Sequence, residues 1–310
     1  MGAEIRGRYV FGLTLALGSA ALGLTAVAVI TTLLSLHHAA PGSNRIMIAG
    51  WRFTYPIVNG AGALLLALGI LGASVIIVAV RAAWRQALAY RRFMTVLQPV
   101  ECLARDRRVG VIPGSGPQAF CAGYLRPGVY VSRRTVELLS DAELDAVLAH
   151  EHHHRRVRDP LRIACGRILC EAVFFLPVLK PLCERYADVA ELSADRAAVR
   201  ASGGQEAPLA SALLVFDESA PPGVSGISPE RVDSLLGQPT CWRLPAVRVA
   251  GSLGALVAVS LVIALISQSA AARATFNLPF LSSRPCVVMT SVLPLAGAIR
   301  MLARRVRQRI

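Results

Sequence analysis

A cluster of histidines in the middle of the chain is the first feature that could do chemistry. Four of the six histidines fall within the five residues His150-Glu151-His152-His153-His154. Residues four apart on a helix share a face, so His150 and His154 can bind one Zn²⁺ ion. Glu151 lies one step round the helix, close enough to reach a metal-bound water without binding the metal. The pattern H-E-x-x-H therefore predicts a zinc site with Glu151 as the general base.

A third ligand is available further along the chain. Glu191 lies 37 positions after His154, in the helix-like stretch Glu191-Leu192-Ser193-Ala194-Asp195. Two histidines and one glutamate make a catalytic zinc site that keeps a position open for water. Asp195 is four residues on and lies on the same face, so it can orient a ligating imidazole from behind. We expect one Zn²⁺ per chain, held by His150, His154 and Glu191.

Each of these assignments has a purely structural alternative. The run HHHRRVR at a helix C-terminus can be a solvated basic cluster, because positive charge suits the helix dipole there. We expect that role for His152 and His153, whose positions do not fit the helical frame. For Glu191 the alternative is a salt bridge with Arg196 or Lys180.

Local patterns place the histidine motif on a helix that follows a β-hairpin. Residues 118–132 (QAFCAGYLRPGVYVS) predict two short strands around a turn at residues 126–128. Ser140 and Glu143 form a capping-box pattern, and the apolar residues that follow have a helical period. Residues 161–181 are apolar but include charges, which predicts a helix buried in the domain or lying at the membrane surface.

Composition indicates a membrane protein with a soluble part. Of the 310 residues 54% are hydrophobic and only 17% are charged, and the mean hydropathy is +0.53. Apart from Glu4, every acidic residue lies between Glu101 and Asp233. Long uncharged runs predict transmembrane helices on either side of this part, at about 9–36, 57–80, 249–267 and, more weakly, 285–300.

Arginines flanking these runs predict the orientation. With four spans, 13 arginines fall on one side and 4 on the other, which places both termini and the central domain in the cytoplasm. The arginines sit at the ends of apolar runs, so we expect the bilayer and not a nucleic acid as their partner. The expected fold is a mainly α-helical multi-pass protein of the cytoplasmic (inner) membrane with an α+β zinc peptidase domain. We expect the chain to divide into two transmembrane helices (1–84), the cytoplasmic peptidase domain (85–245), and two further transmembrane helices with a basic tail (246–310).

The same motifs resemble a known family. A-H-E-H-H-H with E-L-S-A-D is similar to the gluzincin-type integral-membrane zinc metallopeptidases, in which H-E-x-x-H is followed by E-x-x-A-D. The hairpin and the L-S-x-x-E-L pattern at residues 139–144 also resemble that family, over roughly residues 105–240. The extension of the motif to Asp159 and the Phe174-Phe175-Leu176-Pro177 patch resemble the BlaR/MecR antirepressor peptidases more closely than the HtpX and CAAX proteases.

The resemblance implies further site residues. The edge strand Ala119-Phe120-Cys121-Ala122-Gly123 would pair with an extended substrate. Prenyl-protease relatives have a His-Pro before an R-[IV]-x-x-L stretch. Residues 228–235 match that stretch without the histidine, which leaves Arg231 to stabilise the oxyanion. The alternative for Arg231 is a surface salt bridge with Glu230 or Asp233.

These features predict a membrane-embedded zinc endopeptidase. By the resemblance, the substrate is a cytoplasmic protein, most plausibly a transcriptional repressor cut in a signalling response. The beta-lactam sensors of this type carry a large penicillin-binding domain after the last span, and we do not expect one here. Three alternatives stay open: a membrane-protein quality-control or processing protease, a signal transducer with a structural zinc domain, and a basic membrane-surface binding protein. The sequence does not predict the oligomeric state.

Overall fold

The structure analysed is a computed structural model. It describes residues 2–35, 45–48, 51–54, 60–97, 101–104, 106–219, 227–238, 242 and 246–269. The chain divides into two compact units, which are described separately. The first unit combines Met1–Gly23 with Ser74–Leu256, and the second combines Leu24–Ala73 with Val257–Ile310.

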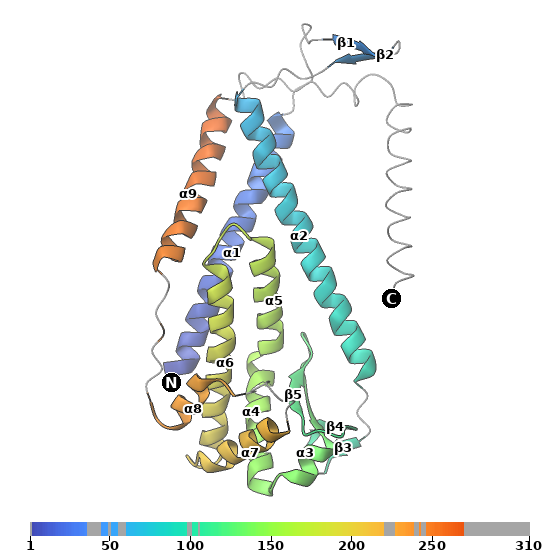
Figure 1. Ribbon diagram of the computed structural model, residues 1–310, viewed down its shortest axis with the longest axis vertical. Helices are drawn as coiled ribbons and strands as arrows, with labels where there is room; N and C mark the ends of the chain where they lie inside the picture. The colour runs from blue at the N-terminus through green and yellow to red at the C-terminus, as the bar shows by residue number, and fades with distance from the viewer. Residues whose placement is uncertain are drawn as a thin grey trace. The chain divides into compact units, whose positions relative to one another are not determined.

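Three helices are long and apolar enough to cross a membrane, and each passes through both units. They are α1 (Gly2–Ser35), α2 (Gly60–Val96) and α9 (Ala246–Ser269), with candidate spans Gly7–Thr32, Ala67–Val96 and Ala246–Leu265 (Figure 1). They overlap the first three predicted spans, but the second candidate span, Ala67–Val96, begins 10 residues later and ends 16 residues later than the predicted 57–80. The fourth, at 285–300, lies outside the described residues. Helix α2 continues without a break through residue 85, where we placed the start of the soluble domain.

The second unit contains a close contact between α1 and α2 and a small β-hairpin. Ala28 on α1 and Leu68 on α2 pack with α9 side chains. Gly72 on α2 allows this approach, because a Cβ there would lie 2.4 Å from the Val29 side chain. The hairpin consists of β1 (Arg45–Ile48) and β2 (Trp51–Thr54), which pair antiparallel.

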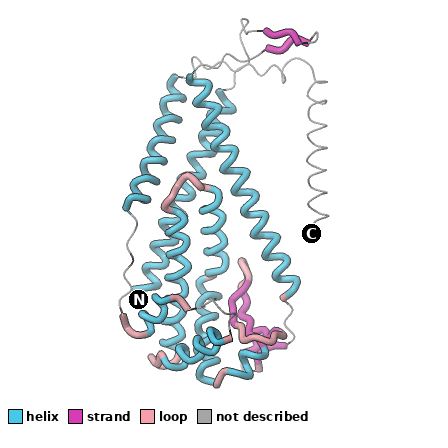
Figure 2. Tube along the Cα trace, viewed as in Figure 1, coloured by secondary structure: helices cyan, strands magenta, loops and turns pink. Residues whose placement is uncertain are grey.

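The first unit contains a four-stranded sheet in the order β3-β4-β6-β5. The strands are β3 (Glu101–Leu103), β4 (Asp106–Ile112), β5 (Ala119–Ala122) and β6 (Gly128–Ser132). The predicted hairpin is confirmed, since β5 and β6 pair antiparallel. Val129 and Val131 are buried while Tyr130 between them is less so, which is the period-2 pattern of a half-buried strand. The sheet packs against α4 through β5 and β6 (Figure 2).

Between the sheet and α9, the described residues form six helices. They are α3 (Arg133–Leu138), α4 (Asp141–Val157), α5 (Asp159–Ala172), α6 (Leu179–Ala201), α7 (Ala207–Glu218) and α8 (Pro229–Leu235). The predicted capping box at the start of α4 is confirmed: the Ser140 side chain accepts from the Glu143 amide, and Glu143 accepts from the Ser140 amide. Leu144, Val147 and Leu148 then face the sheet core, so the cap and the apolar period together hold α4 in place.

The structure corrects the single helix expected over residues 161–181. Helix α5 ends at Ala172 and α6 begins at Leu179, so the segment is a helical hairpin. Pro177 lies in the turn, where its missing N–H and fixed φ oppose a continuous helix. A disulfide between Cys170 and Cys183 joins the two helices, a pairing that no cysteine spacing in the sequence indicates.

Candidate metal centre

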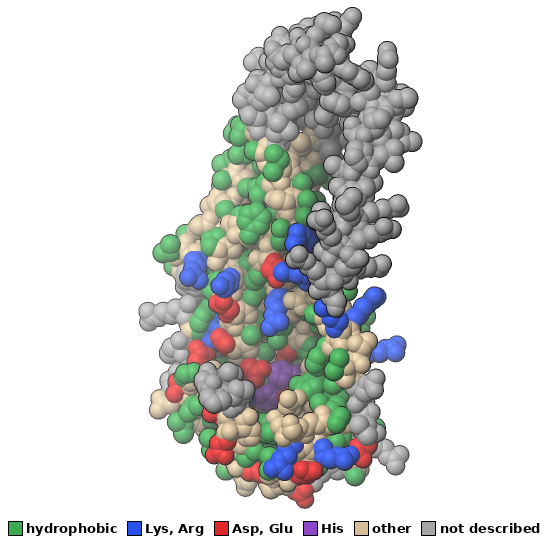
Figure 3. Space-filling view, turned by 45° about the vertical axis from the view of Figure 1, so that its right-hand side comes forward, with side chains coloured by type: hydrophobic (Ala, Val, Ile, Leu, Met, Phe, Trp, Pro, Cys, Tyr) green, Lys and Arg blue, Asp and Glu red, His purple; other side chains and the backbone are tan. Residues whose placement is uncertain are grey.

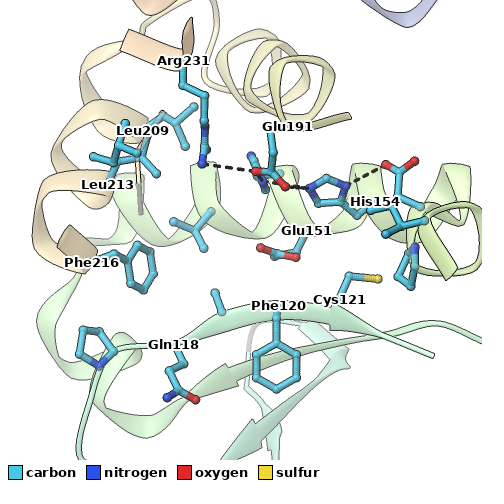
Figure 4. A pocket seen from close by; sticks show the side chains of 18 of the residues that line it. Gln118, Phe120, Cys121, Glu151, His154, Glu191, Leu209, Leu213, Phe216 and Arg231 are labelled. Carbon is cyan, nitrogen blue, oxygen red and sulfur yellow. Dashed lines mark hydrogen bonds and ion pairs between the residues drawn. The ribbon is translucent and has the colours of Figure 1, made fainter. Parts of the chain in front are cut away.

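Helices α4 and α6 bring three possible metal ligands together. One ligand atom each of His150, His154 and Glu191 lie within 4.8 Å of one another. The two Nε2 atoms are 3.1 Å apart, and they lie 3.5 Å and 3.6 Å from the two Glu191 carboxylate oxygens (Figure 4). His150 and His154 meet because α4 is regular between them, and Glu191 is added because α6 packs across α4. The predicted ligands therefore converge on one point.

The arrangement fits a zinc ion. Zinc binds imidazole nitrogen at about 2.0–2.1 Å in a tetrahedral site, so two such nitrogens are separated by about 3.3–3.4 Å. The observed Nε2 separation of 3.1 Å is close to that value. Two histidines and one glutamate are a donor set of catalytic zinc, which leaves a fourth position for water. When bound, the metal would supply Lewis acidity toward a water and a carbonyl oxygen.

A buried carboxylate lies behind each histidine. Asp195 Oδ1 is 3.0 Å from His150 Nδ1, although that nitrogen lacks the alignment of a hydrogen bond. Asp159 Oδ2 is 2.8 Å from His154 Nδ1, and the Tyr186 hydroxyl donates to the other Asp159 oxygen. Such partners fix the ring orientation and leave Nε2 for the metal. Asp195 thus lies where we predicted an orienting carboxylate.

Asp159 is a site residue that the sequence analysis did not select. Its position five residues after His154 was noted only as part of the resemblance. Arg158, with φ 58°, ends α4 in the left-handed region and starts α5 at Asp159. The turn brings the carboxylate back beneath His154, which no helical period indicates.

The charges of the site favour a cation at the ligand cluster. Burial by itself would lower the pKa of His150, but the carboxylates of Asp195 and Glu191 raise it to about 9. Burial would conversely raise the pKa of Glu191, yet His150 and His154 hold it below its ordinary value. The cluster therefore stabilises positive charge, whether a proton or a metal ion carries it.

Glu151 faces the cavity and not the ligand cluster. Its side chain points into the gap between α4 and β5, opposite Cys121 (Figure 4). Burial raises the pKa of Glu151, against the opposing effect of His150 and His154. A carboxylate with a raised pKa is a better proton acceptor near neutral pH than an exposed one. Burial also raises the pKa of the Cys121 thiol to about 12, so this thiol is protonated near neutral pH.

A cavity of about 650 Å³ opens in front of the three ligands. Three residues of the predicted edge strand line it (Ala119, Phe120 and Cys121), and β5 is indeed at the end of the sheet. Ala122 and Gly123 do not line it: Ala122 is buried, and Gly123 turns the chain at φ +117°. The opposite wall is apolar and comes mainly from α7, with Leu209, Leu213 and Phe216. The cavity has room for a peptide segment between β5 and α7.

Arg231 is held by two carboxylates of the site. Its guanidinium donates to Asp195 at 2.8 Å and 2.6 Å, and its Nη1 lies 3.3 Å from Glu191. The alternative of a surface salt bridge with Glu230 is wrong, because Arg231 is buried and Glu230 pairs with Arg185. Arg231 lines the cavity, so it can face a substrate. Its contacts also hold the Asp195 and Glu191 carboxylates in place beside His150.

The other two histidines of the motif do not join the ligands, but the solvated cluster expected for them is wrong. His153 is only 4% exposed and lies 3.4 Å from an Arg156 nitrogen. His152 is half-buried and its Nε2 lies 2.9 Å from Asp106 on β4. His152 thus ties α4 to the sheet.

Comparison with known proteins agrees with this geometry. Residues 83–193 match the sequence model of Peptidase family M48. The match covers about a third of the chain, and it includes the histidine motif and Glu191 but ends before Asp195 and Arg231. It supports an M48-type metallopeptidase domain. No curated protein matches the chain.

Proposed function

We propose that this protein is a membrane-embedded zinc endopeptidase that cuts a cytoplasmic protein, most plausibly a transcriptional repressor. The observation that supports hydrolysis is the convergence of His150, His154 and Glu191 beside a cavity into which Glu151 points. A structural zinc site needs neither the cavity nor a buried carboxylate that stands apart from the ligands. These two features favour the enzyme over a non-catalytic transducer.

Each residue of the site has its own role in the proposed hydrolysis. His150, His154 and Glu191 would hold the zinc, and Asp195 and Asp159 orient the two imidazoles. An extended peptide adds to the free edge of β5, backbone to backbone, and brings its carbonyl to the metal side of the cavity. Glu151 accepts the proton of the attacking water and delivers it to the leaving amine. Arg231 lines the cavity beside Glu191, and we assign it the stabilisation of the oxyanion.

The choice of a repressor rests on the resemblance to the BlaR/MecR peptidases. Asp159 belongs to the extended motif that supports this resemblance, and it contacts His154 directly. The missing His-Pro in residues 228–235 argues against a prenylated substrate. The rival is an HtpX-like protease that degrades or processes membrane proteins.

New protein termini would distinguish these substrates. We expect cells with the wild-type protein to contain N-terminal peptides from a DNA-binding protein that are absent from cells with Glu151→Gln. Both strains carry the same amount of folded protein in the membrane, which an antibody measures as the control. If the new termini come only from membrane proteins, the repressor is rejected and the quality-control role replaces it.

The proposed orientation makes a separate prediction. Reporter fusions after Asn44 and after Ser282 should report the outer side of the membrane, and a fusion after Gly204 should report the cytoplasm. The reason is the uneven distribution of arginines between the two sides, 13 against 4. An outer-side signal from the Gly204 fusion would overturn the four-span topology and every cytoplasmic substrate with it.

A further inference from the structure

The turn between α5 and α6 packs among the three apolar helices. Its buried residues Val173, Leu176 and Leu179 form one cluster with side chains of α1 (Leu17, Ala21 and Leu22), α2 (Ala79) and α9 (Ala255 and Leu256). The Val178 amide donates to Ser252 Oγ of α9 at 3.1 Å. The hairpin therefore reaches from the metal centre to the membrane helices of its own unit (Figure 2).

A band of polar and amphipathic side chains lies just on the domain side of this turn. Arg81 follows Ala79 by two residues, and Arg248 precedes Ser252 by four, so both lie within about one helical turn of the contacts. Trp84, 65% exposed, and Arg85, which pairs with Glu171, continue the band. Figure 3 shows acidic and basic side chains on the surface above the histidines. Arginine and tryptophan gather at the boundary between hydrocarbon and water, so this band indicates that boundary.

The length of α2 agrees with a boundary at this level. Its 37 residues extend over about 55 Å, whereas the hydrocarbon of a bilayer is about 30 Å thick. The excess is about 25 Å, and the 16 residues from Arg81 to Val96 account for about 24 Å of it. The end of α2 is thus a rigid extension in water, consistent with its arginines.

The apex of the hairpin, Phe174, is 56% exposed although it lies beyond the charged band. We propose that the segment Phe174–Pro177 is a membrane anchor, which inserts between the lipids of the leaflet on the domain side with Phe174 among the acyl chains. A bulky ring exposed at that level is costly in water and stable in hydrocarbon. The occupant is the lipid bilayer, because the turn continues the apolar surface of the spans against which it packs.

This anchor fixes the height of the metal centre. From Leu179 at the turn to Glu191 there are 12 residues of α6, a distance of about 18 Å. The metal centre therefore stands about 18 Å along α6 from the anchored turn, on the domain side of the charged band. A tethered substrate would need about six extended residues to reach it, whereas a soluble segment reaches it freely. This consequence rests on the proposed function; the anchor itself does not.

Quenching of tryptophan fluorescence by brominated lipids tests the anchor. The full chain and its Phe174→Trp variant are reconstituted in phosphatidylcholine vesicles with bromine near the headgroup or near the chain end. The fluorescence of the tryptophan introduced by Phe174→Trp is the difference between the variant and the wild type. We expect bromine near the headgroup to quench most of this fluorescence and bromine near the chain end to quench much less. Leu138→Trp, an exposed apolar position at the far end of α3, is the matched control and should keep its emission.

Every outcome bears on the anchor without any use of peptidase activity. If Phe174→Trp is quenched no more than Leu138→Trp, the turn lies in water or against protein and the proposal is wrong. If the deep bromine quenches more, the hairpin crosses toward the middle of the bilayer, and an anchor at the boundary is rejected. The native Trp84 checks the boundary independently, since Trp84→Phe should remove emission that the shallow bromine quenches.

Discussion

Replacing Glu151 with glutamine should abolish peptide-bond hydrolysis and leave zinc bound. Glutamine keeps the size and hydrogen-bonding shape of the side chain, but it cannot accept the proton of the attacking water. General base catalysis contributes about 10²–10⁴-fold to the rate, and a loss in this range is expected in kcat. Because Glu151 lies apart from the cluster of His150, His154 and Glu191, the zinc content should stay at that of the wild type.

The measurement combines cleavage of a flexible peptide or casein-like substrate with metal analysis of the purified protein. Glu137→Gln is the matched control, because Glu137 is exposed on α3, where it pairs with Arg134. Activity of Glu151→Gln within a few-fold of wild type would exclude Glu151 as the base. Loss of zinc together with activity would instead make Glu151 part of the metal site, and the division of roles proposed above would fail.

Replacing Glu191 with alanine should abolish zinc binding, whereas His152→Ala should leave it intact. Alanine removes one of three protein ligands and leaves Arg231 without one of its two carboxylate partners. Loss of a residue that merely supports a ligand costs about 10–100-fold in metal affinity, so loss of the ligand itself should cost more. His152 points toward Asp106 on β4 and contributes nothing to the cluster.

Zinc affinity is measured by competition with a chelator, and thermal unfolding in detergent verifies that each variant is folded. Glu184→Ala provides the comparison on the same helix, since Glu184 is exposed and lies 3.9 Å from Lys180. Asp159→Asn should fall between the two extremes, with affinity reduced about 10–100-fold, because it removes no ligand but disturbs the orientation of His154. Equal loss of zinc in Glu191→Ala and His152→Ala would contradict the ligand assignment.

The elements that carry the site follow from short-range patterns. Ser140 and Glu143 start α4, a spacing of four puts His150 and His154 on one face, and the hairpin over residues 118–132 follows from its alternation and turn. Each of these features depends on residues that are neighbours in the chain. Backbone geometry relates such neighbours in the same way in any protein, so the sequence alone determines them.

Tertiary packing decided the rest of the site. Asp159 orients His154 because Arg158 reverses the chain between α4 and α5. Arg231 braces Asp195 because α8 packs on α6, 36 positions away. His153 is buried, not solvated, because neighbouring elements cover that side of α4. In each case the deciding partner comes from another segment, and no spacing in the sequence states which segments will meet.

The membrane boundary shows the same division. The uncharged runs determined that α1, α2 and α9 could span a bilayer, because length and composition suffice for that. The runs did not determine where the domain begins, since α2 continues unbroken past residue 85. They also did not separate a buried helix at 161–181 from the hairpin that the structure contains. The turn of this hairpin packs against α1, α2 and α9, and these contacts put Phe174 beyond the charged band. The depth of a segment in a membrane depends on the helices against which it packs, so one segment of sequence does not determine it.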